Sequence, residues 1–224
     1  MDSAALYRLM TWLSPAYPTG AFTYSHGLEA AIEAGLVKDR ATLIDWLGYV
    51  VAYGSGRAEA MLFRCAYERA GDAAALDQVA DLAAALRGSA ELALESEQQG
   101  EAFLATTRRA WPAAHLDAFA RRRHGRPVTL SVAVALAVAE TVPIETALLA
   151  YLQALVSNLV MAGVRLIPLG QSDGQQAIAA LAPAVMDAVG AALDCPLENI
   201  GSASPMVDWC SMRHETQYTR LFRS

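Results

Sequence analysis

Two groups of residues in this sequence have types that could do chemistry. Cys210, Met212 and His214 alternate near the carboxyl end, and thiol, thioether and imidazole groups bind soft metal ions. On a helix, alternate residues point about 200° apart, so these side chains would not converge on one ion. Ser25 and His26 join a nucleophile to a base, but adjacent residues of a helix do not face each other. We therefore expect neither a metal site nor a catalytic site.

A polar corner, VMAGVRLIPLGQSDGQQ, follows a long apolar segment. Arg165 is its one cation and lies at its apolar end. Pro168 and Gly170 are expected to end the preceding helix, because proline lacks an N–H and clashes with the preceding turn. Ser172 and Gln175 have the capping-box spacing, which predicts that a new helix begins there. An apolar helix, an arginine at its end and a sharp polar turn indicate a docking surface rather than a catalytic pocket.

The composition indicates the fold class and argues against some classes of function. The chain has 224 residues, of which 54% are apolar, and its formal net charge is −6. An alanine-rich sequence with few alternating β-branched runs predicts an all-α fold, and we expect one globular helical domain of about ten helices over residues 1–224. The negative charge argues against nucleic-acid binding. Three scattered cysteines and the absence of an export signal favour a reducing cytoplasm. Walker A, GxGxxG and HExxH motifs are absent.

Helical periodicity and capping residues predict the elements that position these groups. Ser25 is expected to cap a helix that runs to Gly35, and Asp39 to cap the next one. Pro183 is expected to kink or split the helix after the polar corner. The remaining predicted helices are Ala4–Leu13, Gly56–Ala70, Ala73–Leu86, Ser89–Arg109, Thr129–Ala139, a long one from Pro143 and a last one from Ser204-Pro205 nearly to the end.

Two of these helices have compositions that need interpretation. Ser89–Arg109 carries an acidic run, ELALESEQQG, which we interpret as a solvated face. Thr146–Val164 has no charged residue and is about as long as a bilayer span. Gln153 and Asn158 interrupt it, so we expect a helix buried in a helical core and no membrane contact.

Three stretches together resemble the UreF family of urease accessory proteins. They are LSPAYPTGAFTYSHGLEAAIEAGLV near the start, VRLIPLGQSDGQ at the polar corner, and the ending SMRHETQYTRLFRS. The acidic run ELALESEQQG gives weaker support. The stretches lie at both ends and in the middle, so the resemblance covers nearly the whole chain. Tyr17, within PAYPTG, departs from the commoner opening, in which a smaller or apolar residue is usual.

The resemblance implies an all-α cytoplasmic protein that forms a homodimer and is not an enzyme. It implies that the protein binds a second accessory protein, UreD (also called UreH), and then the GTPase UreG. The assembly engages apo-urease and helps to insert nickel into its active site. On this hypothesis no cofactor is bound directly, since nickel and GTP are handled by the partner GTPase.

The resemblance also assigns candidate partner-binding or dimer residues, and no catalytic or metal residue. Tyr24 and Glu29 belong to the opening motif and are expected in the partner-binding and dimer region. Arg165 stands at a position that is basic in the family, and it is expected near the GTPase-facing or dimer surface. The same surface is expected to include three residues of the polar corner, namely Gln171, Asp173 and Gln175. The UreD/UreH partner is expected to order the terminal residues Arg220, Phe222 and Arg223.

A second hypothesis stays open, namely a GTPase-activating or GTPase-modulating regulator of UreG. Such a protein supplies an arginine to the γ-phosphate, and Arg165 is the best candidate. An arginine of this kind belongs on an exposed loop, whereas Arg165 is expected at a helix end beside apolar residues. A third hypothesis, a nickel carrier, would need convergent histidine or cysteine ligands.

Overall fold

The computed structural model describes all 224 residues and contains helices but no strand, so the all-α prediction is confirmed. The elements in chain order are α1 (Ser3–Trp12), the 3-10 helix η1 (Ala21–Thr23), α2 (Leu28–Glu33), α3 (Arg40–Ala52), α4 (Ser55–Glu68), α5 (Ala73–Ala85), α6 (Ala90–Ala110), α7 (Ala114–Arg122), α8 (Leu130–Val138), α9 (Ile144–Leu166), α10 (Gln171–Asp194), η2 (Leu197–Asn199) and α11 (Pro205–His214).

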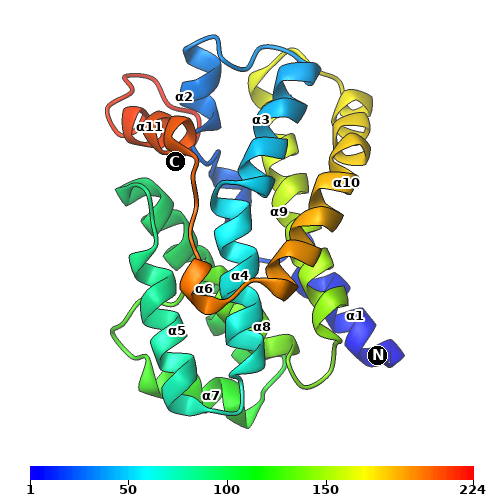
Figure 1. The fold of residues 1–224 in the computed structure, drawn as a ribbon, viewed down its shortest axis with the longest axis vertical. Helices are drawn as coiled ribbons and strands as arrows, with labels where there is room; N and C mark the ends of the chain where they lie inside the picture. The colour runs from blue at the N-terminus through cyan, green and yellow to red at the C-terminus, as the bar shows by residue number, and fades with distance from the viewer.

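One continuous core of 53 buried residues runs through the molecule. At its centre lies α8, in which every residue from Ser131 to Val138 is buried. A helix that is apolar on all sides must be surrounded by other elements, and α4 and α6 pack against α8. The long helices α9 and α10 lie side by side and pack against α3 and α4 (Figure 1). The helices α2 and α11 lie together at one end, where the carboxyl end of the chain also lies.

The helix α9 matches the prediction of a long apolar helix that begins after Pro143. Both α9 and α10 are long and apolar enough to cross a membrane by length and composition alone. Half of the most apolar window of α9 is buried inside the protein, and 28% of that of α10. The length and composition of two such helices are weak evidence for a membrane span, because a core helix of a soluble protein passes the same test.

The structure confirms one of the two predicted helix caps near the start of the chain. Asp39 caps α3, as predicted, and its carboxylate accepts the Thr42 N–H at 2.9 Å. Ser25 is not the N-cap residue of α2, as the prediction had it. Both His26 and Gly27 have positive φ values, 60° and 76°, and the helix starts only after Gly27, which is the N-cap. The Ser25 hydroxyl nevertheless accepts the N–H of Glu29, in the first turn of α2, at 3.2 Å.

The polar corner also differs in detail. The prediction that α10 starts with a Ser172–Gln175 capping box is wrong. Gly170 is the N-cap, its N–H donates to the Asp173 carboxylate at 3.1 Å, and the helix begins at Gln171. Asp173 is the third helical residue, and its carboxylate accepts the N–H of the N-cap residue, as a glutamate at that position does in a capping box. Pro183 does not split α10, which is one helix from Gln171 to Asp194.

The last helix is shorter than predicted. It begins at Pro205, as expected, but ends at His214 rather than near the end of the chain. The following residues, Glu215–Ser224, contain no helix and are called the tail below. Their backbone groups bond to other parts of the chain instead of to each other, as the next section describes.

Candidate functional site

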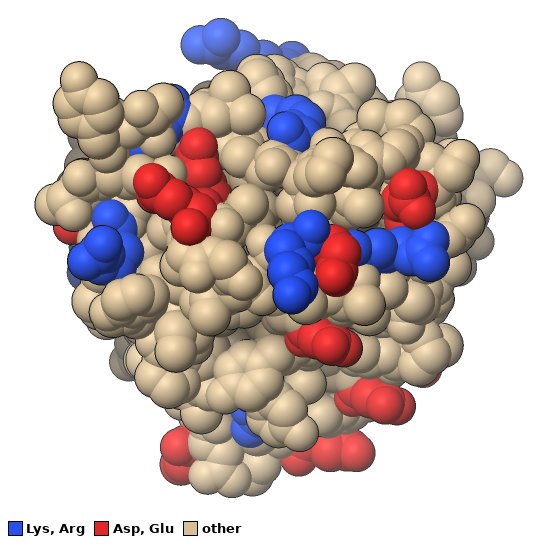
Figure 2. Space-filling model, turned by 90° about the horizontal axis from the view of Figure 1, so that it is seen from above, with Lys and Arg blue, Asp and Glu red and all other residues tan.

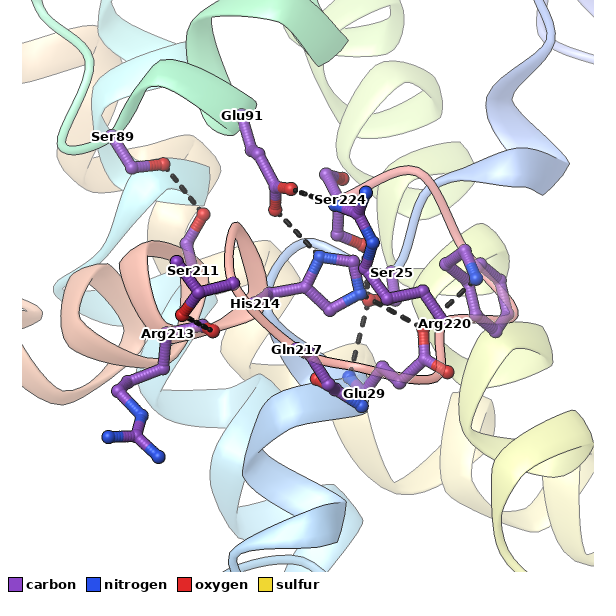
Figure 3. Close-up of polar contacts among 12 residues, drawn as sticks. Ser25, Glu29, Ser89, Glu91, Ser211, Arg213, His214, Gln217, Arg220 and Ser224 are labelled. Carbon is purple, nitrogen blue, oxygen red and sulfur yellow. Dashed lines mark hydrogen bonds and ion pairs between the residues drawn. The ribbon is translucent and has the colours of Figure 1, made fainter.

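Three buried carboxylates hold the tail, and we call them the acidic clamp. They are Glu29 on α2 and Glu91 and Glu95 on α6 (Figure 3 draws Glu29 and Glu91). The exposed fractions of Glu91 and Glu95 are 7% and 5%, so the interpretation of the acidic run as a solvated face is wrong. The two glutamates are four residues apart and share one helix face, and that face points toward the tail and α11.

Glu29 makes the main backbone contact with the tail. Its carboxylate accepts the N–H of Leu221 at 2.7 Å and the N–H of Phe222 at 2.9 Å. It also lies 3.0 Å from Nε2 of His214 (Figure 3). A carboxylate that accepts two adjacent backbone N–H groups takes the donors that a longer α11 would have used internally. The tail is therefore non-helical at this point because of a long-range contact.

His214 and Arg220 connect the tail to α6. His214 is fully buried, and its Nδ1 lies 2.7 Å from a Glu91 oxygen. The other Glu91 oxygen accepts a hydrogen bond from Nη1 of Arg220 at 3.0 Å. Glu91 thus lies between two nitrogen groups, one from the last helix and one from the tail.

The end of the tail pairs with the segment before α2. The Arg223 N–H donates to the Thr23 carbonyl at 2.8 Å, and the Ser25 N–H donates to the Ser224 carbonyl at 2.8 Å. The Ser25 hydroxyl donates to that same carbonyl. The Ser224 hydroxyl donates to Glu95 at 2.8 Å, and Ser224 is fully buried. Backbone and side-chain contacts therefore fix the tail to its last residue.

His26 stands next to this pairing but does not form a catalytic pair with Ser25. Its Nδ1 lies 3.2 Å from Glu95 and its Nε2 2.5 Å from the Ser55 hydroxyl, while Ser25 bonds to the tail. Burial opposes protonation of His26, but the charge and hydrogen bond of Glu95 and the charge of Glu59 together outweigh burial and raise the pKa of His26 above its usual value. Glu95 therefore contacts His26 and the tail with the same carboxylate.

Arg165 covers the buried ring of Phe222. Its guanidinium carbon lies 4.3 Å from the ring centroid, in the geometry of a cation–π contact. Nη2 donates to the Phe22 carbonyl at 2.7 Å, and Nε donates to Met161 at 3.3 Å. Burial lowers the pKa of Arg165. Arg165 thus joins the end of α9 to η1 and to the tail.

The structure brings together six of the predicted residues and leaves three apart. Glu29, Arg165, Arg220 and Phe222 meet at the tail as described, and Tyr24 lies beside them. The Tyr24 hydroxyl donates to Gln98 at 2.6 Å, and the Arg223 guanidinium lies 5.6 Å from the Tyr24 ring centroid. The other three residues lie at the start of α10. Gln171 and Gln175 are exposed, and Asp173 pairs with Arg40 at 2.9 Å.

Two consequences follow for the predicted roles. Tyr24, Glu29 and Phe222 are buried, so none of them presents a surface to a partner while the tail is in place. In this structure the chain itself positions Arg220, Phe222 and Arg223, whereas the prediction assigned their ordering to a partner. Sequence reasoning missed Glu91, Glu95 and the clamp role of His214. The spacing of Glu91, Glu95 and Gln99, one turn apart along α6, was the available signal.

No group of three or more His, Cys, Asp or Glu side chains is arranged so that it could hold a metal ion. Cys210 is buried, which raises the pKa of its thiol to about 11, while Met212 is exposed. The letters GQSDG at Gly170–Gly174 match the GxSxG pattern of a hydrolase elbow. That elbow is a strand-to-helix turn, whereas Ser172 is an exposed residue in the first turn of α10, at a turn between two helices. The pattern therefore does not indicate a hydrolase.

A hollow of about 390 Å³ lies between α2, α11 and the tail. Trp209 and Tyr218 line it and are exposed, with exposed fractions of 47% and 102%. The Arg213 guanidinium lies over the Trp209 ring at 5.6 Å. We call Trp209, Arg213 and Tyr218 with this hollow the docking patch. Figure 2, which looks at the molecule from above, shows positive and negative side chains interspersed across a mainly uncharged face.

Comparisons with known proteins agree with the sequence resemblance. The sequence model of the family described as UreF matches residues 37–182. The chain is 50% identical to the urease accessory protein UreF of Granulibacter bethesdensis, over 99% of this chain and 94% of that protein. It is also 50% identical to the protein of that name from Rhodopseudomonas palustris strain HaA2, over 100% and 95%. The chain therefore belongs to the UreF family of urease accessory proteins, and it is an accessory protein rather than an enzyme.

Proposed function

We propose that this protein is a scaffold subunit of a urease-maturation assembly in the cytoplasm. It binds UreD/UreH, recruits the GTPase UreG, and presents both to apo-urease for GTP-dependent nickel insertion, as a homodimer within that complex. Nickel and GTP are handled by UreG, and this chain holds no cofactor of its own. Membership of the UreF family supports the role in urease maturation. The separate roles of this chain, UreD/UreH and UreG are part of the proposal.

The docking patch is the observation that carries the scaffold proposal. Trp209 and Tyr218 expose large aromatic surfaces beside a hollow, and Arg213 adds a guanidinium to them. Tryptophan, tyrosine and arginine are the residue types that dominate protein–protein binding energies. Tyr218 belongs to the tail, so the acidic clamp fixes one side of the patch. We assign this surface to UreD/UreH.

The regulator hypothesis has less support. An arginine that enters the GTPase site must be free to reach the γ-phosphate. The Arg165 guanidinium instead bonds to the Phe22 carbonyl and covers Phe222. Freeing it would uncover a buried aromatic ring. We therefore favour a positional role for Arg165, in which it holds the tail.

The affinity of patch variants for UreD/UreH tests the proposal. Trp209→Ser and Tyr218→Ser, separately and together, remove exposed side chains and should leave the helical circular dichroism and the Tm unchanged. Truncation of a central interface aromatic costs about 2 kcal/mol or more of binding free energy. Each single variant should therefore weaken binding roughly 30-fold, as measured by isothermal titration calorimetry or biolayer interferometry. Tyr53→Ser is the matched control, because Tyr53 is 57% exposed and lies directly after α3, outside the patch. Wild-type affinity in the double variant would rule out this surface as the site.

A further inference from the structure

A second hollow, of about 690 Å³, lies between α1, α7 and the segment that follows α8. Aromatic rings, small apolar groups and a few polar groups line it: Arg8, Trp12, Ala110–Leu116, Ala137, Glu140 and Thr141. In Figure 1, α1 and α7 lie in the lower half of the molecule, whereas α2 and α11, which border the docking patch, lie in the upper half. Small-molecule sites have volumes of about 300–1,000 Å³, so this separate hollow is large enough for a small ligand.

Three buried nitrogens of the residues that line this hollow have no hydrogen-bond partner. They are Nε of Arg8, Nε1 of Trp12 and Nε2 of His115. Seven buried side-chain polar atoms are without a partner in the whole structure, so three of them at one hollow are a concentration. Folded proteins pair nearly all of their buried polar groups, and a buried donor without a partner is costly. The hollow therefore lacks the acceptor that these nitrogens need.

The chemistry of these nitrogens indicates an anionic oxygen. The indole and the guanidinium are donors only, and the guanidinium keeps its positive charge. Nδ1 of His115 lies 3.9 Å from a Glu140 oxygen, which is too far for a hydrogen bond, so Nε2 is free to carry the ring proton and donate it. A carboxylate accepts several such bonds. The Glu140 side chain, which is 72% exposed, adds a negative charge to the rim and so disfavours a dianion such as phosphate.

The walls of the hollow indicate an apolar, aromatic body for the same ligand. The rings of Trp12 and Trp111 meet edge to face, with centroids 5.9 Å apart, and Pro112 and Leu116 continue this wall. A further ring packs favourably against such a pair. The three nitrogens have almost no accessible surface, so a ligand that bonds to them must move side chains. Arg8 and His115 are only half-buried, which makes this movement feasible.

We propose that this hollow is a binding site for a small aromatic monocarboxylate. The carboxylate accepts hydrogen bonds from Arg8, Trp12 and His115, and the aromatic body lies against Trp111. A ligand that binds only the folded chain stabilises it, so α1 and α7 are held together more firmly when the site is filled. The inference does not depend on the scaffold proposal, because no residue of the docking patch, the acidic clamp or the tail lines this hollow.

Titration of the ¹⁵N-labelled full chain with 3-phenylpropionate tests the site. The indole N–H resonance of Trp12 should move and saturate, whereas that of Trp209, in the docking patch, should stay in place. The Tm should rise with the ligand concentration. Two further probes separate the two halves of the ligand. 3-Phenylpropanamide has the body without the charge, inorganic phosphate has a charge without the body, and each should bind about tenfold more weakly or worse.

One variant and its matched control complete the test. Arg8→Gln should weaken 3-phenylpropionate binding about tenfold or more, because it removes the charged donor. Arg121→Gln should bind as the wild type does, since Arg121 is an exposed arginine of α7 that does not line the hollow. The Tm without ligand shows that each variant is folded, and if Arg8→Gln is not, the wild-type titrations decide alone.

Three results would overturn the assignment. The first is a Trp12 resonance that ignores all three probes up to roughly 10 mM, which would leave bound water as the only partner of these nitrogens. The second is equal affinity for the carboxylate and its amide. The third is loss of UreD/UreH binding in folded Arg8→Gln, which would assign the hollow to a segment of a partner protein. The docking-patch variants test the scaffold proposal separately, so the two proposals can fail independently.

Discussion

Replacing Glu29 with glutamine tests how the tail is held, because the two side chains have the same shape and differ in charge and in one acceptor. In the structure, one carboxylate oxygen accepts the Leu221 N–H, and the other accepts the Phe222 N–H and contacts His214. An amide NH₂ in place of either oxygen meets a donor instead of accepting from one. Glu29→Gln therefore loses at least one of these hydrogen bonds and weakens the rest.

The size of the effect follows from the number of contacts. Hydrogen bonds to a charged group contribute about 1.5–3 kcal/mol each, and a buried donor without a partner costs a similar amount. Glu29 is 8% exposed, so solvent screening removes little of this. We expect tail docking to weaken by about 2–4 kcal/mol, which is roughly a 30- to 800-fold increase in the equilibrium constant for tail opening.

The assay is exchange of the Leu221 and Phe222 amides at pH 6, together with the rate at which trypsin cleaves after Arg220. Both rates should rise in Glu29→Gln. Glu33→Gln is the matched control, because Glu33 is an exposed carboxylate one turn further along the chain. Wild-type protection of Leu221 and Phe222 in Glu29→Gln would refute the argument that Glu29 holds the tail.

Two further predictions concern the body of the protein. In Gly100→Ala, the new methyl group would lie 2.1 Å from the Val128 carbonyl oxygen, so α6 and α8 must separate, and urea unfolding should show a loss of more than about 2 kcal/mol. Gly190→Ala on α10 meets nothing within 4 Å and should instead stabilise by about 0.5–1 kcal/mol; equal effects of the two would contradict the packing. Arg87→Leu leaves the buried Glu59 carboxylate unpaired and should cost about 3–5 kcal/mol at pH 7. Burial raises the pKa of Glu59, but the Arg87 charge and the hydrogen bonds from Ser131, Arg87 and Tyr151 together outweigh burial and lower the pKa. Without Arg87 the loss of stability should therefore shrink from pH 7 to pH 5, and a loss that stays constant in urea unfolding would contradict this.

The parts of the fold that depend on local chemistry could be predicted from the sequence. The helix α8 consists almost only of apolar residues and α9 has few polar ones, so their burial follows from composition. Asp39 caps α3 through a contact to Thr42, three residues away. Contacts over such short separations leave a direct trace in the residue pattern.

The acidic clamp could not be predicted in this way, because its partners are distant in sequence. Glu91 and Glu95 look solvated beside their neighbours in the sequence, but His26, His214 and the tail, all distant in sequence, make their burial favourable. The same contacts explain why α11 is shorter than its sequence indicated. Glu29 takes the N–H groups of Leu221 and Phe222 from a distance of almost 200 residues, which no local propensity encodes.

Light scattering coupled to size-exclusion chromatography tests the central claim, that this protein is a scaffold, most directly. The protein is run alone, with UreD/UreH, and with UreD/UreH and UreG in the presence of GTP and nickel. The scaffold proposal predicts a stable complex with UreD/UreH of defined stoichiometry, which then takes up UreG. Elution of this protein unchanged from both mixtures would contradict it.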